Sequence, residues 1–388
     1  MKKIAFIGLA ILLFCSFPFQ NNAETIVPGA ERLDSYLPLL KGKKVAVLAN
    51  QSSMVTDTHL VDTLLSLGIN IAYIFAPEHG FRGDADAGET IGNYTDEKTG
   101  LPVISLYGNI KSPPDSILQK IDVTVFDLQD VGLRFYTYMS SLHYLMEASA
   151  NNNKEVIILD RPNPNGFYVD GPVLDMKYRS FVGIYPVPVV HGMTLGEIAR
   201  MANGEGWLTD GKQCTLTVIT CADYTHRSLY RLPVKPSPNL PNMTSIYLYP
   251  SLCFFEATPV SIGRGTDFPF QVYGHPDMKR DTFTFTPESN SGAKNPPLKG
   301  QKCYGVDLRE LPEQELLDKG VSFEYIIDAY NALGKPAKFF NSLFEKLVGV
   351  DYIRPMLIEG KSAEQIKASW QKDVEKFKQQ REKYLLYD

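Results

Sequence analysis

Residues 70–83 read NIAYIFAPEHGFRG, and this stretch decides both the fold class and the expected position of the functional site. Its first six residues are mostly apolar, with β-branched and aromatic side chains, which predicts a buried strand. Pro77 and Gly80 prevent the strand from simply continuing. Glu78 therefore follows the carboxyl end of a strand, where ligands bind in open α/β sheets, and an imidazole and a guanidinium follow it closely.

Further apolar runs alternate with segments of helical pattern on both sides of this stretch. We expect strands at 43–50, 102–107, 122–127 and 155–160, and helices at 58–67, 116–121 and 137–150. Continuous apolar strands that alternate with helices indicate a parallel sheet covered on both faces. The predicted fold class is therefore α/β, with a Rossmann-like doubly wound sheet.

The chain has 388 residues, which is more than one core usually supports. A proline-dense segment at 233–241 predicts the boundary between two domains. We expect a Rossmann-like domain at 24–235 and a smaller α+β domain at 236–388. The second domain should contain short aromatic strands and helices near 313–318, 323–333 and 363–384.

The amino terminus has the pattern of a secretion signal. Two lysines precede an apolar run at 4–14, so we interpret residues 1–23 as a signal peptide and expect a periplasmic or extracellular protein. Lipoprotein anchoring at Cys15 is the weaker alternative, because the bulky Phe14 stands where a small residue is expected. No later run is long and apolar enough to predict an integral membrane span.

Composition narrows the classes of partner. The net charge of −5 provides no basic footprint for nucleic acid. The first strand is followed by Asn50-Gln51-Ser52-Ser53, without the glycines of a dinucleotide fingerprint, and a Walker A motif is absent. We therefore expect no cofactor. Some of the 21 Tyr and 21 Phe could stack on sugar rings, although most should be core residues.

Polar residues follow several of the predicted strands. They are Asn50, Glu78 and His79, then Asp127, Gln129 and Asp130, then Asp160, Arg161 and Asn163. Because parallel strands end at one rim, we expect these groups to gather at one crevice. Other roles remain open for several of them. Asp127 and Asp130 could cap helices, and Asp160 and Arg161 could form an internal ion pair. Arg134 and Tyr136 could contact either a ligand or the core.

Paired carboxylates favour glycoside hydrolysis over other chemistries. One carboxyl group acts as an acid and the other as a nucleophile or base. His79, His191 and His275 are scattered and lack the spacing of a metal motif, so we expect no metal site. A serine nucleophile within G-x-S-x-G is also missing.

Six sequence blocks closely resemble the NamZ-type exo-β-N-acetylmuramidases. They lie at 77–83, 127–138, 160–164, 191–194, 236–239 and 263–266, in order along the mature chain. The resemblance implies a Rossmann-like domain joined to a smaller carboxyl-terminal domain, with the site in the cleft between them. It also implies a muramyl saccharide or peptidoglycan fragment as substrate and release of terminal N-acetylmuramic acid.

The resemblance assigns roles to individual residues. The family's favoured catalytic glutamate corresponds to Glu78, as general acid/base, and Asp127, Asp130 and Glu256 are candidates for the second catalytic group. The candidate substrate-binding residues are Asn50, His79, Arg82, Gln129, Arg134, Tyr136, Asp160, Arg161, Asn163, His191, Asn239 and Arg264. An arginine should bind the lactyl carboxylate of muramic acid, with Arg82 as first choice and Arg264 as second.

One block departs from the family pattern. Residues 256–259 read EATP where the family has Glu-Gly-Thr-Asn, and loss of the asparagine can remove a contact to the sugar. This departure motivates a second hypothesis, a peptidoglycan-fragment binding protein without turnover. A metal-dependent deacetylase is the third alternative.

Overall fold

The computed structural model describes residues 26–83, 92–280 and 282–388. The expected signal peptide and Cys15 lie outside these residues. Within the described part, no helix has both the length and the apolar character needed to cross a membrane. Each cysteine in this part is a free thiol.

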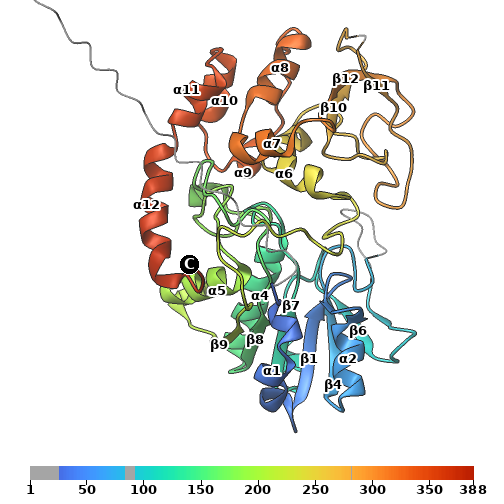
Figure 1. The fold of residues 1–388 in the computed structure, drawn as a ribbon, viewed down its shortest axis with the longest axis vertical. Helices are drawn as coiled ribbons and strands as arrows, with labels where there is room; N and C mark the ends of the chain where they lie inside the picture. The colour runs from blue at the N-terminus through green and yellow to red at the C-terminus, as the bar shows by residue number, and fades with distance from the viewer. Residues whose placement is uncertain (1–25, 84–91, 281) are drawn as a thin grey trace, which may run out of the picture.

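Among the described residues, a seven-stranded sheet organises the first half of the chain (Figure 1). Its strands lie in the order β5 (Tyr94–Thr95), β6 (Pro102–Ser105), β4 (Asn70–Ala76), β1 (Lys44–Ala49), β7 (Val123–Asp127), β8 (Glu155–Leu159) and β9 (Thr215–Ile219). All neighbours pair in parallel except β5 with β6. Numbered along the chain, the parallel strands have the order 3-2-1-4-5-6 of the doubly wound Rossmann fold. The predicted fold class is confirmed.

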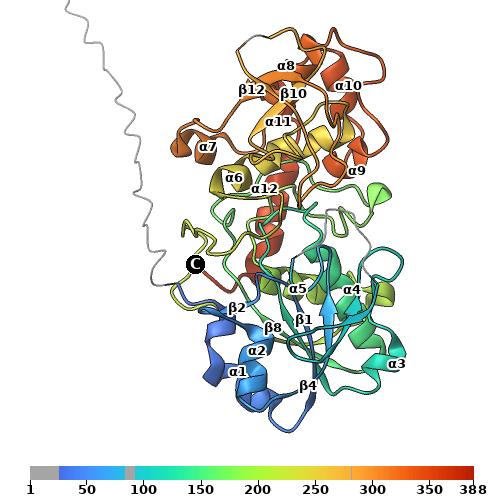
Figure 2. The same cartoon turned by 90° about the vertical axis from the view of Figure 1, so that its right-hand side faces the viewer.

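Helices cover both faces of this sheet. They are α1 (Leu33–Leu40), α2 (Leu60–Ser66), α3 (Asp115–Leu118), α4 (Tyr138–Asn151) and α5 (Leu195–Gly204). Along β1, Val45 and Val47 belong to the core that includes α1 and α2, whereas Ala46 and Leu48 belong to the core that includes α4 and α5. Figure 2 shows α1 and α2 on one side of the sheet and α3 and α4 on the other. Two-residue alternation within continuously apolar strands thus builds two cores.

The second half carries a small antiparallel sheet and short helices, as expected for an α+β region. Its sheet consists of β10 (Val272–His275), β12 (Cys303–Asp307) and β11 (Thr284–Phe285) in that order. Its helices are α6 (Met243–Leu252), η4 (Cys253–Ala257), α7 (Glu313–Lys319), α8 (Glu324–Ala332), α9 (Phe344–Val348) and α10 (Ile353–Ile358). Shorter elements elsewhere are β2 (Met54–Val55), β3 (Thr58–His59), η1 (Gly29–Glu31), η2 (Met176–Tyr178) and η3 (Thr209–Gly211).

The single long helix predicted at 363–384 is wrong. The chain instead forms α11 (Ala363–Ala368), α12 (Gln371–Arg381) and η5 (Glu382–Tyr384). Trp370, at the break, is fully buried, and its Nε1 donates a hydrogen bond of 2.8 Å to Asp170 Oδ1. Its ring also packs against Phe323. Because the helix must turn to bury this side chain, a tertiary contact overrides the local helical pattern.

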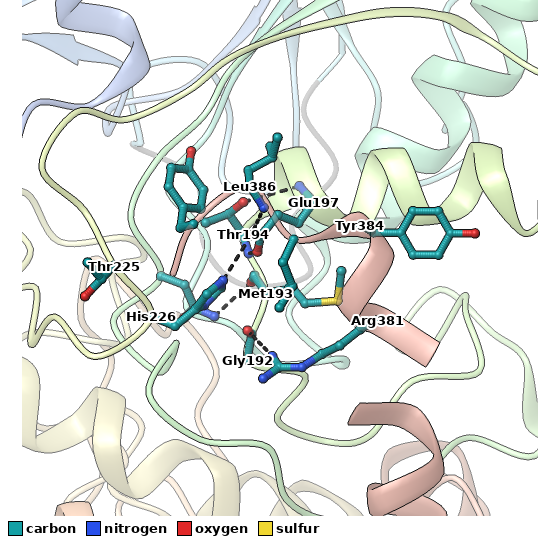
Figure 3. A network of polar contacts seen from close by, with 12 residues as sticks. Gly192, Met193, Thr194, Glu197, Thr225, His226, Arg381, Tyr384 and Leu386 are labelled. Atoms are coloured by element: carbon teal, nitrogen blue, oxygen red, sulfur yellow. Dashed lines mark hydrogen bonds and ion pairs between the residues drawn. The ribbon is translucent and has the colours of Figure 1, made fainter. Parts of the chain in front are cut away.

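Helix α12 returns the end of the chain to the first half (Figure 1). Figure 3 shows Arg381 directed toward Gly192, and Leu386 and His226 directed toward Glu197. Glu197 is fully buried in the capping box of α5. It accepts hydrogen bonds from Thr194 N at 2.9 Å and Leu386 N at 2.7 Å, and His226 Nε2 lies 3.0 Å away. The Glu197 carboxylate therefore connects the first turn of α5 to the segment around Leu386.

Replacing Glu197 by Ala should lower the free energy of unfolding by about 3–5 kcal/mol, the scale for breaking a buried charged network. The physical reason is that the buried donors at Leu386 and His226 lose their acceptor. Urea denaturation followed by circular dichroism measures the change. Glu375→Ala, on the exposed side of α12, is the matched control and should change stability by less than about 0.5 kcal/mol. Equal effects of the two variants would contradict this role of Glu197.

Candidate active site

A cavity of about 120 Å³ lies where the two halves of the chain meet. The carboxyl ends of the sheet strands point toward the half that carries α6 to α10 (Figure 1). The first half contributes Glu78, His79, Phe135, Tyr136, Thr137, Tyr138 and Val182 to the lining. The second half contributes Ser237, Asn239, Leu240, Tyr249, Glu256, Arg264 and Phe270. The cavity therefore has the position that the doubly wound topology favours for a ligand.

Glu78 reaches the cavity from the loop that follows β4. This loop turns sharply, because His79 has a φ of 71° and Gly80 a φ of 77°. Thr137 Oγ1 donates a hydrogen bond of 2.7 Å to Glu78 Oε2. Tyr107, which follows β6, also hydrogen-bonds Glu78, and both burial and this carboxylate raise the pKa of the Tyr107 phenol. Hydroxyl groups from two neighbouring segments therefore hold the Glu78 carboxyl group in place.

Glu256 lines the same cavity from η4, in the second half of the chain. Arg264 donates to its Oε1 from Nε at 2.9 Å and from Nη2 at 2.6 Å. Burial alone would lower the pKa of the Arg264 guanidinium, but the facing Glu256 raises it above its ordinary value. The guanidinium also lies 5.0 Å from the centroid of the Phe270 ring. A carboxylate with a compensating cation thus shares the cavity with Glu78.

Aromatic rings form much of the remaining wall. Tyr136 and Tyr138 pack edge to face at 4.8 Å, as do Tyr249 and Phe270 at 4.6 Å. The hydroxyl groups of Tyr136 and Tyr138 donate to Pro236 O at 2.9 and 3.2 Å. The proline-dense segment between the two halves is therefore bonded to the rim of the sheet. Apolar ring faces beside a few polar groups suit a ligand such as a sugar.

Two family models together match most of this chain. The amino-terminal model of the exo-β-N-acetylmuramidase NamZ matches residues 45–244, and the carboxyl-terminal model matches residues 247–387. The chain belongs to the NamZ family.

Similar proteins agree with this assignment. The chain is 36% identical over 387 residues to the peptidoglycan β-N-acetylmuramidase NamZ of Bacillus subtilis (strain 168), with 95% of this chain and 91% of that protein covered. It is also similar to two crystal structures of DUF1343 family proteins from Bacteroides fragilis NCTC 9343. One is 53% identical with a TM-score of 0.88, and the other is 29% identical with a TM-score of 0.79. Each alignment covers 94% of this chain and 99% of the solved one.

Of the residues predicted from the NamZ blocks and the strand ends, several line the cavity. They are Glu78, His79, Tyr136, Asn239, Glu256 and Arg264. Asn239 is fixed by a 2.8 Å hydrogen bond from its Nδ2 to Gly292 O. The block at 263–266 supplies Arg264 between two glycines of positive φ. At Gly265 a Cβ would lie 2.4 Å from Glu288 O, so a larger residue would displace this turn.

Asp127 and Arg161 lie outside the cavity lining and pair with each other. Arg161 donates to Asp127 from Nε at 2.5 Å and from Nη2 at 2.9 Å, and both side chains are almost fully buried. Arg161 Nη2 also bonds Met54 O at 2.9 Å. The pair therefore joins the end of β7 to the loop that follows β8 and to β2.

Asp130 is likewise buried outside the cavity lining. Its Oδ2 accepts a 2.6 Å hydrogen bond from Gly132 N, and its Oδ1 has no partner among the described residues. Burial raises the pKa of the Asp130 carboxyl group to about 7, although the backbone N–H groups of Gly132 and Val131 oppose this shift. At Gly132, with a φ of 78°, a Cβ would lie 2.1 Å from Asn163 Oδ1. This loop is therefore closely packed.

Other predicted polar residues also bind the protein itself. Asn50 Nδ2 donates to Tyr138 OH at 2.6 Å, which orients a residue of the cavity wall. Gln129 Nε2 donates to Asp130 O and Pro162 O. Asn163 Nδ2 donates to Met193 O at 2.9 Å.

Arg134, Asp160 and His191 lie deeper and connect the two halves of the chain. Arg134 donates to the carbonyl oxygens of Pro172, Val187, Leu347 and Val348. Asp160 accepts from Thr194, Gly196 and Tyr387, and burial raises its pKa to about 6. His191 is fully buried, and burial with the nearby Arg381 lowers its pKa to about 3.

Arg82 lies beside the Glu78 loop but does not line the cavity. Its Nε and Nη2 donate to Asp96 at 3.1 and 2.9 Å, and its guanidinium stacks on Phe81 at 4.3 Å. Burial raises the pKa of Asp96, but the hydrogen bonds from Arg82 and Thr99 outweigh it and lower the pKa overall. Arg82 therefore anchors the loop to the turn after β5.

The sequence prediction missed Tyr107 and Thr137, which hold Glu78. A signal was available for each. Thr137 belongs to the NamZ block at 127–138, and Tyr107 closes the apolar run 102–107, although strand β6 ends at Ser105. Within residues 26–83, 92–280 and 282–388, no three His, Cys, Asp or Glu side chains are grouped so that they could hold a metal ion.

Proposed function

We propose that this chain is an exo-acting glycosidase that releases terminal N-acetylmuramic acid from peptidoglycan fragments. The observation that carries the proposal is that two carboxyl groups, Glu78 and Glu256, line one aromatic cavity from opposite halves of the chain. Glycoside hydrolysis requires such a pair. Family membership and the 36% identical peptidoglycan β-N-acetylmuramidase support the choice of sugar.

The two carboxyl groups have different surroundings, and this supports different roles. Hydroxyl groups of Thr137 and Tyr107 contact Glu78, whereas the Arg264 guanidinium faces Glu256. In the proposed reaction Glu78 donates a proton to the glycosidic oxygen as the bond from that oxygen to C1 breaks. Glu256 either bonds to C1 or takes a proton from the attacking water, and water supplies the hydroxyl group that C1 finally carries.

We propose Glu256, among the three candidates, as the second catalytic group. Asp127 already has a bidentate partner in Arg161, and Asp130 is enclosed by its own loop. Neither carboxylate lines the cavity.

Product release from a defined disaccharide tests the proposal. Incubation with N-acetylmuramyl-β-1,4-N-acetylglucosamine should yield free N-acetylmuramic acid, detected by mass spectrometry. A non-catalytic binding protein, the alternative motivated by Ala257 to Pro259, would bind the disaccharide in calorimetry and release nothing. A metal-dependent deacetylase would release acetate and lose activity in a chelator.

Arg264 is the residue we propose to bind the lactyl carboxylate that distinguishes muramic acid from N-acetylglucosamine. Its bonds to Glu256 use Nε and Nη2, so Nη1 is the nitrogen through which it would reach a second carboxylate. Arg264→Ala should weaken binding of N-acetylmuramic acid by about 30-fold or more, as expected for truncating one partner of a buried charge pair.

Calorimetry with the two free sugars measures this selectivity. In Arg264→Ala the affinity for N-acetylglucosamine should change much less than the affinity for N-acetylmuramic acid. Arg82→Ala is the matched control, because Arg82 is paired with Asp96 outside the cavity lining. Loss of selectivity in Arg82→Ala but not in Arg264→Ala would assign the lactyl group to Arg82.

We also propose that the chain is exported, with residues 1–23 as its signal. Peptidoglycan fragments arise outside the cytoplasmic membrane, so an exported enzyme would meet them there. The lysines and the apolar run at the amino terminus support this proposal.

A further inference from the structure

A second, larger hollow adjoins the cavity that contains Glu78. It has a volume of about 580 Å³, and its lining includes Lys111, Tyr144, Arg179, Phe181, Val182 and Lys346. We call this hollow the cationic groove. Val182 lines both the groove and the Glu78 cavity. The two hollows therefore meet at Val182, and a ligand that extends from the cavity past this side chain would enter the groove.

Aromatic rings continue from the proposed catalytic acid into the groove. Tyr107 hydrogen-bonds Glu78, and its ring centroid lies 5.9 Å from that of Phe181. Phe181 in turn stacks on Tyr144 at 6.2 Å, with the two planes 19° apart. Ser140 Oγ donates to Phe181 O at 2.8 Å and fixes this segment to α4. These partly exposed rings give the groove an apolar wall against which a sugar can pack.

The groove is positively charged on a chain whose net charge is −5. Lys111 Nζ lies 4.9 Å from the centroid of the Phe181 ring. The charge of Arg179 is partly compensated by the nearby Glu147, and Arg179 also hydrogen-bonds His143. Lys111 and Lys346 form no ion pair with any residue in the described part of the chain, and the groove lining contains no acidic residue. A ligand that carries a carboxylate would complement these two lysines.

We propose that the cationic groove binds the part of the glycan strand that leaves after cleavage. This inference rests on the proposed function. Peptidoglycan strands alternate N-acetylglucosamine with N-acetylmuramic acid, so the first leaving sugar is neutral. The second carries a lactyl carboxylate where its stem peptide has been removed. The apolar wall formed by Tyr144, Phe181 and Val182 packs against the neutral sugar, and Lys111 and Lys346 attract the carboxylate beyond it.

The groove therefore makes the enzyme prefer strands over disaccharides. Because these lysines lie at a solvent-accessible rim, their contribution should be modest and should weaken with salt. A tetrasaccharide with free lactyl groups should have a higher kcat/KM than the disaccharide. A tetrasaccharide whose inner lactyl group is amidated should lose most of that advantage.

The decisive experiment compares these three substrates in Lys111→Ala/Lys346→Ala at low ionic strength. The double variant should lower kcat/KM for the free tetrasaccharide by about three- to tenfold and leave the disaccharide unchanged. The matched control is Lys41→Ala/Lys120→Ala. These two exposed lysines precede β1 and β7, at the amino ends of the strands and therefore opposite the cavity. The control should leave kcat/KM for all three substrates unchanged.

Other outcomes overturn the inference in distinguishable ways. Equal loss on the disaccharide and the tetrasaccharide would mean that the lysines support the cavity itself. No difference between the free and the amidated tetrasaccharide in the wild type would exclude recognition of the lactyl carboxylate. If the wild type releases no N-acetylmuramic acid even from the disaccharide, the proposed function fails, and this inference fails with it.

Discussion

Replacing Glu78 by Gln should preserve the fold and lower hydrolysis of N-acetylmuramyl-β-1,4-N-acetylglucosamine by about 10²–10⁴-fold, the usual scale for general acid–base catalysis. Glutamine has the size of glutamate and can still accept a hydrogen bond from Thr137 Oγ1, but it cannot donate a proton to the leaving oxygen. Steady-state kinetics with a circular-dichroism spectrum of the variant measures both effects. Glu97→Gln, an exposed glutamate in the turn after β5, is the matched control and should retain full activity.

Substrates with different leaving groups distinguish the proposed role of Glu78 as proton donor from the proposed role of Glu256 at C1. An aryl muramide with an acidic phenol as leaving group needs little protonation, so Glu78→Gln should lose much less activity on it than on the disaccharide. Glu256→Gln should lose activity on both substrates, because its role is at C1. Full activity of Glu78→Gln on the disaccharide would remove Glu78 from the mechanism. Equal losses of Glu78→Gln on both substrates would mean that Glu78 is not the proton donor.

The sheet was predictable because its strands are a local property of the sequence. The apolar runs 43–50, 70–75, 122–127 and 155–160 correspond to β1, β4, β7 and β8 within a residue or two at each end. Their alternation with helices was enough to predict a doubly wound fold. The break at Trp370 was not predictable in this way, because its cause is Asp170, 200 residues away in the chain.

The candidate site was only partly accessible to the same reasoning, for a physical reason. Polar residues at strand ends do gather near one rim, but a polar group there can face a ligand or another polar group of the protein. Asn50, for example, orients Tyr138, while Tyr136 lines the cavity directly. The hydrophobic periodicity predicts which residues lie at the ends of the strands. Which of these residues line the cavity depends on how the loops pack, and the periodicity does not predict that packing.

Asp127 and Arg161 can be used to test whether a polar group at the strand ends binds a ligand or another group of the protein. Asp127→Leu should lower the free energy of unfolding by about 3–5 kcal/mol, because it leaves the buried Arg161 guanidinium without its carboxylate. Removing both charges with Asp127→Leu/Arg161→Met should cost less than the sum of the two single replacements, because no unpaired charge is then buried. Urea denaturation of the four proteins of this cycle measures the coupling. Asp57→Ala, at an exposed turn, is the control and should change stability by less than about 0.5 kcal/mol.

Activity measured on the same proteins tells an internal ion pair from a catalytic group. Asp127→Asn keeps an acceptor for Arg161 and should fold, and since Asp127 does not line the cavity, its kcat should stay near that of the wild type. A folded Asp127→Asn variant with kcat reduced by about 10² or more would instead identify Asp127 as the second catalytic group. Glu256→Gln should show the opposite combination, with little loss of stability and a large loss of kcat. The side-chain oxygen of glutamine can still accept a hydrogen bond from Arg264, and 28% of the Glu256 side-chain surface is accessible to solvent.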